Sequence, residues 1–445
     1  MKTIRTLFLV GSLGALAAAG CDDDTKAPTP TPPRDGATTM DMAGDAGGKL
    51  DGGAETGAEV GVEVGAEVGA EVGAEVGADG GDAPASPYQP ALLINLPATT
   101  CNTPDGMRVD PKTGDVILSC PNFFAITTPG TDTTPPVFAA PAVLMKITPG
   151  NALQPYFSNL PLPGHTGKIP NRPGPMGLDF GPDGNVYIAD HQYRYDTNYK
   201  SRILRVNVDG TGNPTTSDVV VEGLRLANAV MWSKDYLYVS DTWAFEGTEG
   251  RSAIYRFTRT ELAAATTANP IRITKPTSPT ATDPHMFHQF LTEMGRGLNM
   301  AGADGITFDA AGTLYTGKFG DGIMTRIAIN ADGSKGTVDE NWIKDAKLTC
   351  VDGIFFHAGS GKIYVADSQK NAIQVVDPVT KSVTTLWENA NTDGAMGLLD
   401  QPAEPWIRGT DLIIANFDAG FMAAGQPGKN TVHDAPHTIS VIKLQ

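Results

Sequence analysis

One phrase recurs six times after residue 88, and this repetition restricts the fold more than any other feature of the sequence. Each copy places an apolar strand, a turn of Gly, Pro, Asp or Ser, and a second apolar strand in that order. The copies are DGMRVDPKTGDVILSC (105–120), MGLDFGPDGNVYIAD (176–190), NAVMWSKDYLYVSD (228–241), DGITFDAAGTLYTGK (304–318), DGIFFHAGSGKIYVAD (352–367) and MGLLDQPAEPWIRGTDLIIAN (396–416). Most copies are followed by a third apolar strand, and some by a fourth. Repeated units of four antiparallel strands predict the blades of a β-propeller.

Six copies predict an all-β fold, a six-bladed propeller of four-stranded antiparallel blades over residues 88–445. The C-terminal segment 438–445 would be the third strand of the sixth blade. Residues 91–96 would supply the outermost strand of that blade and close the ring, which removes the exposed sheet edges of an open array. A parallel α/β fold is disfavoured because amphipathic helices are missing between the strands.

The first 21 residues predict a lipoprotein signal peptide. Lys2 and Arg5 precede an apolar stretch at 7–19 that is too short to span a bilayer, and small residues lead to Cys21. The ending Ala-Ala-Gly-Cys resembles bacterial lipoprotein signals, and this resemblance implies that Cys21 is lipidated. An ordinary signal peptide with an incidental cysteine is the alternative. We therefore expect a lipid-anchored protein of the bacterial cell envelope, at the periplasmic face or the cell surface.

Residues 22–87 predict a disordered acidic linker containing a Gly-Ala-Glu-Val repeat. Glycine at every fourth position disfavours a helix, and the segment has too little apolar surface to offset its ordering entropy. It carries fifteen acidic and three basic residues, and so contributes −12 to the net charge of −17. The mildly acidic remainder argues against nucleic acid as a partner. We expect a monomer that binds a small-molecule substrate or ligand and meets the membrane only through its anchor.

Alignment of the six copies places six residues at one structural position, the start of the innermost strand of each blade. They are Asp105, Met176, Asn228, Asp304, Asp352 and Met396. Innermost strands line the channel of a propeller, so these side chains should converge at one mouth. Neighbouring carboxylates raise one another's pKa, a bound cation removes that cost, and oxygen donors suit calcium or magnesium. The alternative is ordinary turn chemistry, in which Asp bonds backbone N–H groups and the following Gly takes a positive φ.

The third and fourth copies resemble one known family. LANAVMWSKDYLYVSDT (226–242) is similar to the PNG-strand-turn-LYVADT phrase of the gluconolactonase family, which includes senescence marker protein and luciferin-regenerating enzyme. GADGITFDAAGTLYTGKFGDGIMTRI (302–327) is similar to the family's PDGIAVDAEGNLWVA phrase. The resemblance implies a six-bladed propeller with one divalent metal ion in its channel. Calcium is the expected ion, with magnesium or zinc as alternatives.

The resemblance also implies roles for individual residues. Asn228 and Asp304 match metal ligands of the family, and Asp304 would also serve as general base; Asp105 stands where the family has Glu. Asp352 is an additional carboxylate, available as a fourth ligand or a second catalytic base. The family often has an Asn-Asp pair where this chain has Pro175-Met176, which leaves a sugar-lactone substrate in doubt. A lining that includes Met176 and Met396 suits a less polar ligand.

Two functions of different classes follow from this pattern. The first is a metal-dependent hydrolase of lactones or esters, and the second is a noncatalytic propeller that binds a ligand or a protein at the cell surface. A propeller scaffold serves both, so the fold does not decide between them. A redox role with a quinone cofactor is disfavoured because the sequence lacks the basic channel cluster that an acidic cofactor would need.

Histidine and cysteine residues add further expectations. His285 and His288 lie in an insertion at 283–302, where they could share a helix face and cap the channel, or lie in a surface loop. His165 precedes the second copy and could reach the same mouth. Cys101 and Cys120 flank the strands of the first copy, and export makes a disulfide between them plausible, with Cys350 as the odd thiol.

Overall fold

A computed structural model describes residues 87–131, 133–247, 250–280, 282–293, 301–419 and 428–444. The predicted signal peptide, the lipidation site Cys21 and nearly all of the predicted linker lie outside these ranges. Within them, no helix combines the length and the apolar character that a membrane crossing requires.

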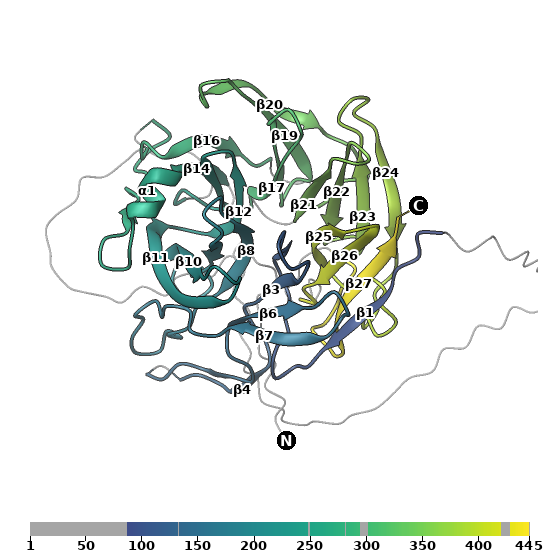
Figure 1. Cartoon of the computed structure of the whole chain (residues 1–445), viewed down its shortest axis with the longest axis horizontal. Helices are drawn as coiled ribbons and strands as arrows, with labels where there is room; N and C mark the ends of the chain where they lie inside the picture. Colours follow the sequence, from purple (N-terminus) through teal and green to yellow (C-terminus); the bar gives the residue numbers. More distant parts are fainter. Residues whose placement is uncertain are drawn as a thin grey trace, which may run out of the picture. The chain divides into compact units, whose positions relative to one another are not determined.

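Six antiparallel sheets form a ring, as predicted (Figure 1). The first blade contains β2 (Met107–Val109), β3 (Val116–Cys120), β6 (Val143–Ile147) and β7 (Leu153–Phe157). The second contains β8 (Pro175–Phe180), β9 (Val186–Asp190), β10 (Ser201–Val208) and β11 (Pro214–Leu224), with β15 (Ile271–Arg272) pairing in parallel at its edge. The third contains β12 (Ala227–Ser233), β13 (Tyr236–Asp241), β14 (Arg251–Thr258) and β16 (Met286–Leu291).

The remaining blades follow the same order from the centre of the ring outwards. The fourth contains β17 (Ala303–Phe308), β18 (Leu314–Lys318), β19 (Ile323–Ile329) and β20 (Lys335–Ile343). The fifth contains β21 (Ile354–His357), β22 (Lys362–Asp367), β23 (Ala372–Val376) and β24 (Val383–Glu388). The sixth contains β25 (Pro402–Arg408), β26 (Asp411–Asn416), β27 (His437–Lys443) and β1 (Ala91–Leu96).

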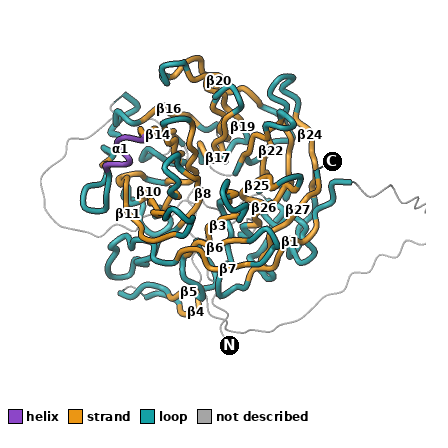
Figure 2. Tube along the Cα trace, in the orientation of Figure 1, coloured by secondary structure: helices purple, strands orange, loops and turns teal. Residues whose placement is uncertain are grey.

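The ring closes as the sequence predicts. Strand β1, from the start of the described chain, pairs antiparallel with β27 from its end, in the register Ala91↔Val441 to Leu96↔His437. Two short elements lie outside the blades (Figure 2): the helix α1 (Arg259–Ala264), and a hairpin of β4 (Ile126–Thr128) and β5 (Val137–Phe138). The helix begins with a capping box between Thr258 and Glu261, which satisfies two free backbone donors.

The hydrophobic core lies between neighbouring blades. The second strand of four blades carries a tyrosine at one repeated position, and all four are buried: Tyr187, Tyr238, Tyr315 and Tyr364. The ring of Tyr187 packs edge-on against Trp232 of the next blade, with centroids 5.1 Å apart. Tyr238 packs against Phe308 of the fourth blade at 5.0 Å. The repeated phrase therefore supplies four blades with a buried aromatic group, which in the second and third blades packs against the next blade.

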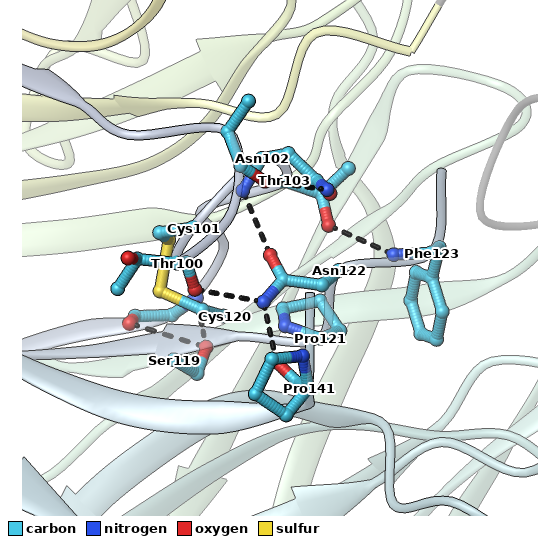
Figure 3. Close-up of a disulfide and its surroundings, with 12 residues drawn as sticks. Thr100, Cys101, Asn102, Thr103, Ser119, Cys120, Pro121, Asn122, Phe123 and Pro141 are labelled. Carbon is cyan, nitrogen blue, oxygen red and sulfur yellow. Dashed lines mark hydrogen bonds between the residues drawn. A yellow bond between two sulfur atoms is a disulfide. The ribbon is translucent and has the colours of Figure 1, made fainter. Parts of the chain in front are cut away.

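A disulfide joins Cys101 to Cys120, with their Cα atoms 5.2 Å apart, and this confirms the predicted pair (Figure 3). The side chain of Asn122 lies beside it, accepts a hydrogen bond from the backbone of Asn102 (2.7 Å) and donates to two carbonyl groups. Among the described cysteines, Cys350 is free, and it is buried. The disulfide links the segment before the innermost strand β2 to the last residue of the next strand, β3.

The sixth copy is out of register with the prediction. Its innermost strand is β25, six residues after the expected start at Met396, which is 77% exposed. The pair Arg408↔Asp411 closes a tight turn through Gly409, and the pairing of β25 with β26 runs back from that turn to Pro402↔Asn416. Met396 therefore does not line the channel. It precedes Gly397, which packs against the backbone of the outermost strand β1.

Candidate metal-binding site in the channel

The innermost strands contact one another in a closed ring, β2–β8–β12–β17–β21–β25 and back to β2. Figure 1 shows β8, β12, β17, β21 and β25 around the centre of the propeller. The residues at the start of these strands are Asp105, Met176, Asn228, Asp304, Asp352 and Glu404, and we call them the channel ring. Five of the six are the residues that the alignment predicts. Ala403 holds the equivalent position of the sixth blade, because Pro402 pairs with Asn416 as Ala303 pairs with Lys318. Glu404 is the next residue, and its charge raises the pKa of the ring carboxyl groups.

Glycine follows the ring residue in four blades because the next innermost strand passes very close. A Cβ atom on Gly106 would lie 2.6 Å from the carbonyl oxygen of Met176, and one on Gly177 would lie 2.8 Å from that of Asn228. Gly305 and Gly353 meet the backbone of the next blade in the same way. None of these four glycines has a positive φ. The Asp-Gly pairs are therefore close-approach positions and not turns, which brings the preceding side chains together.

The ends of the second strands hold the chain as it enters the innermost strands. The carboxylate of Asp190 accepts a hydrogen bond from the backbone N–H of Gly174 at 2.7 Å. The carboxylate of Asp241 likewise accepts from Leu226 at 2.8 Å. The corresponding residues of the fifth and sixth blades are Asp367 and Asn416. The recurring Ala-Asp, Ser-Asp and Ala-Asn endings of the repeats thus fix where each ring residue begins.

The channel ring concentrates four carboxyl groups in a buried place. Burial raises the pKa of Asp304 well above its usual range, and the charges of Asp352, Asp105 and Glu404 raise it further. Burial, with the charges of Asp352 and Glu404, also raises the pKa of Asp105. Burial and the charge of Glu404 raise the pKa of Asp352 to about 8, against the opposing hydrogen bond from Ser368. Ionised, these groups repel one another strongly.

Asp304 has the strongest requirement for a cation. It is 2% exposed, and its Oδ2 atom is buried with no hydrogen-bond partner. The amide of Asn228 bonds to it and lowers its pKa. A buried, unpaired carboxylate oxygen is costly, and a divalent cation would offset that cost. Carboxylate and amide oxygens suit calcium or magnesium, so the residues of the ring fit such an ion.

A buried arginine lies three residues beyond Asp105 on the first innermost strand. Arg108 is 3% exposed, and its Nη1 donates to Oε1 of Glu404 at 2.6 Å. Its Nε lies 3.5 Å from Asp179, and its guanidinium stacks 4.0 Å from the ring centre of Trp406. Burial raises the pKa of Glu404, and Arg108 opposes this rise. Arg108 therefore places a fixed positive charge directly beside the channel ring.

The sequence suggests that His288 and His165 line the channel, and the structure places the two histidines differently. His288 lies on β16, the outermost strand of the third blade, where its Nε2 is 2.9 Å from Glu340; it therefore does not line the channel. Residues 286–291 pair with β14 as a strand, so the expected helical lid and the alternative of a loop are both wrong there. His165 bonds Gln192, at 3.0 Å, in the loop that follows β9. The loop begins after Asp190, the last residue of β9, which pairs with Pro175 at the start of β8.

Sequence reasoning missed Glu404, Arg108 and Asp179. One signal in the sequence could have located Glu404. The short turn at 409–410 sets the register of the hairpin, and counting back from it places the start of the innermost strand at 402. The Met-Gly pair at 396–397 obscured it by matching Met176-Gly177. Arg108 and Asp179 stand three residues after ring positions, in the same channel-facing phase. The contact between Arg108 and Asp179 joins two blades, so no local pattern in the sequence predicts it.

No family model matches the chain, and no curated protein matches it. Similar solved structures include luciferin-regenerating enzyme, at 12% identity, covering 80% of this chain and 97% of the other, with a TM-score of 0.46. A gluconolactonase from Xanthomonas campestris shares 10% identity over 80% and 90%, at 0.43. The calcium-binding protein regucalcin from Agrobacterium tumefaciens shares 13% over 80% and 96%, at 0.45. Sugar dehydrogenases also match. These structures include the group that the third and fourth blades resemble, at similarities that carry no conclusion about activity.

Proposed function

We propose that the chain is a metal-dependent hydrolase of lactones or esters, with its reaction centre at the channel ring. The observation that carries this proposal is the buried, unpartnered Oδ2 of Asp304 among the charges of three other carboxyl groups. Carboxyl groups this buried and this close together cost stability when they ionise, unless they serve a cation. When bound, such an ion would polarise the substrate carbonyl and stabilise the charge that develops on its oxygen.

Asp304 and Asn228 would hold the ion, with Asp105 as a further oxygen donor. In the described chain, no three ring carboxylates have ligand oxygens within 4.8 Å of one another. As they stand, the ring carboxylates leave positions around an ion for amide, water or substrate oxygens. Calcium accepts such a mixture of carboxylate, amide and water oxygens.

Asp352 is placed to hold and move a proton. Its Oδ2 lies 2.5 Å from the Oγ of Ser368, and that oxygen lies 2.8 Å from the carbonyl of Pro402. The Ser368 hydroxyl donates its one hydrogen to Oδ2 of ionised Asp352, and when Asp352 is protonated that hydrogen is free for the carbonyl of Pro402. A pKa of about 8 keeps Asp352 protonated at neutral pH. Asp352 would then protonate the leaving alkoxide, while Asp304 accepts a proton from the attacking water.

The substrate should be less polar than a sugar lactone. Met176 stands in the ring where a polar pair would contact sugar hydroxyl groups, and it is 2% exposed. An apolar side chain at that point offers no hydrogen bond to a hydroxyl, which would leave the hydroxyl unsatisfied. We therefore expect lactones or aryl esters with an apolar substituent to be preferred.

The test measures metal content and hydrolysis on the same samples. Elemental analysis of the full chain should find stoichiometric calcium or magnesium, and a panel of lactones and aryl esters should be hydrolysed. Asp304→Ala and Asn228→Ala should lose the ion, and Asp304→Ala should lose activity. Asp332→Asn is the matched control, because Asp332 lies in an exposed turn of the same blade. Activity retained in Asp304→Ala would refute the mechanism; metal without hydrolysis would favour the noncatalytic binding propeller.

We also propose that the protein is exported and held to a membrane through lipid on Cys21. The support is the order of charged, apolar and small residues before this cysteine. Labelling with a radioactive fatty acid should mark the wild-type chain and not Cys21→Ser. The same substitution should move the protein from the membrane fraction to the soluble fraction, and an unlabelled wild-type chain would refute the proposal.

A further inference from the structure

A second group of ionisable side chains lies in the sixth blade, outside the channel ring. Asp418 follows β26, and His433 and His437 lie at the other end of the connection to β27. Asp400 precedes β25, and Asp434 follows His433. We call these five residues the closing-blade cluster. Their ligand atoms lie within 4.8 Å of one another in two overlapping groups that share Asp418.

One oxygen of Asp418 faces both imidazoles. Its Oδ2 lies 3.1 Å from Nδ1 of His437 and 3.3 Å from Nδ1 of His433. Zinc bonds of about 2.0–2.2 Å in a tetrahedron place neighbouring ligand atoms about 3.3–3.5 Å apart. The two observed separations are therefore close to those around such an ion, although His433 must give up its hydrogen bond to the carbonyl of Asp418. The two rings are stacked with centroids 4.8 Å apart, so both nitrogens already face the carboxylate from one side.

Two carboxylates of this cluster each have one oxygen without a partner, whereas Asp418 also accepts from the amide of Asn430 at 3.3 Å and from the backbone N–H of Asp434 at 3.2 Å. Asp400 is 1% exposed, and its Oδ1 atom has no hydrogen-bond partner. Oδ1 of Asp434 is likewise buried and unpartnered. Among the described residues, no Lys or Arg forms an ion pair with Asp400, Asp418 or Asp434. A bound metal ion would complete this group of three carboxylates and two imidazoles.

We propose that the closing-blade cluster binds one divalent transition-metal ion, zinc, through Asp418, His433 and His437, with Asp400 or Asp434 as the fourth ligand. Two imidazole nitrogens favour zinc over calcium and magnesium, which take oxygen ligands. His433 Nδ1 also lies 2.6 Å from the backbone carbonyl of Asp418, as a hydrogen-bond donor. Binding requires the tautomer that carries its proton on Nε2, so that Nδ1 offers its lone pair to the metal.

The ion would stabilise the point where the ring closes. Phe417, next to Asp418, packs on Phe123 and Phe124 of the first blade, and the ring of His433 lies 4.7 Å from Phe124. Phe123 and Phe124 follow the strand that ends in the disulfide cysteine Cys120. The metal would thus hold both ends of the 417–436 connection against the neighbouring first blade. This role is structural and does not rest on the hydrolase proposal.

The experiment uses the full chain with any purification tag removed. After chelator treatment it is titrated with Zn²⁺ and, as a spectroscopic probe, with Co²⁺. We expect about one zinc ion per chain and the visible absorption of tetrahedral cobalt. His433→Gln and His437→Gln should each weaken zinc binding at least tenfold. His357→Ala is the control, because His357 lies in an exposed hairpin and contacts Ser360.

Several outcomes overturn this proposal. They are a wild-type chain that binds no zinc, cobalt spectra of octahedral type, or histidine variants that bind zinc as tightly as wild type. Asp418→Asn keeps the shape of the side chain and removes its charge, so it decides the matter if the histidine variants fail to fold. Asp304→Ala should lose calcium and keep zinc. Failure of the hydrolase proposal would therefore leave the zinc measurement unaffected.

Discussion

The channel ring and the closing-blade cluster both collect buried carboxylates, but they are built in opposite ways. The ring takes one residue from each blade, at the same position in the first five, and its donors are oxygens, with Arg108 beside them. The cluster comes from a single blade and adds two imidazoles, His433 from the irregular connection after β26 and His437 from the first position of β27. Donor chemistry therefore separates the two sites: oxygen ligands suit calcium, and imidazole nitrogens suit zinc. The propeller repeat produces the first site, and a loop outside the repeat produces the second.

The largest expected difference between the two sites is in catalysis. Asp304→Asn should lower hydrolysis by about a thousandfold, because removing a general base or a charge stabiliser costs roughly this much. Asp418→Asn should leave kcat within about threefold of wild type at a temperature where both variants are folded. Steady-state kinetics on one lactone or ester substrate checks both variants. Equal losses in both would mean that the two sites act as one.

The next effect concerns the charge pair beside the ring. Glu404→Gln should lower the free energy of unfolding by about 3 kcal/mol, because the buried Arg108 then keeps only Asp179, at 3.5 Å, as a charged partner. Denaturant unfolding measures this change. Glu388→Gln removes an exposed pair with Lys429 and should cost less than about 1 kcal/mol. Similar losses in both variants would contradict a buried, structural role for Arg108.

A smaller effect is expected from the glycines that let the innermost strands approach. Gly305→Ala should destabilise the fold by about 2 kcal/mol and weaken calcium binding, since its Cβ would meet the backbone of Asp352 and Ile354. Gly210→Ala is the matched control, because Gly210 has open space around it. Zinc binding should not change in either variant. Unchanged stability in Gly305→Ala would show that the channel is wider than the structure indicates.

The smallest expected difference between the two sites is in how pH changes the free energy of unfolding. Burial and neighbouring charge raise the pKa of Asp352 to about 8 and that of Asp400 to about 9. Unfolded Asp titrates near pH 4, so each group's contribution is full below about pH 4 and is lost as pH rises through its folded pKa. Metal-free protein should therefore become less stable from pH 5 to pH 9.

Denaturant unfolding of the chelated chain at several pH values measures this loss. Asp352→Asn and Asp400→Asn should each flatten part of the profile. Calcium should restore stability at high pH through the ring, and zinc through the cluster. Profiles that are the same for the wild type and both variants would contradict the assignment of these protons.

Much of the fold follows from local pattern, because a propeller blade is built from neighbouring strands joined by short turns. The alternation of apolar residues and the turn composition located the blades, and the match of both chain ends located the closing strand β1. The ring residues of the first five blades followed from the same repeat, as did the cysteine pair 101–120. At Asp105, Asp304 and Asp352 the following glycine marks the position, because the next strand leaves no room for a side chain.

Only the tertiary structure decided the features that depend on contacts between distant segments. The sixth blade has Ala403 at the repeated position and Glu404 where four other blades have glycine, so the repeat gives no mark there and Glu404 appears only once β25 is paired. Arg108 meets Glu404 across the closure of the ring, almost three hundred residues apart in the chain. Asp418, His433 and His437 converge because the two ends of one connection fold back on each other. Strand periodicity is a local property of the chain, whereas the burial and pairing of charges are set by which surfaces the closed ring brings together.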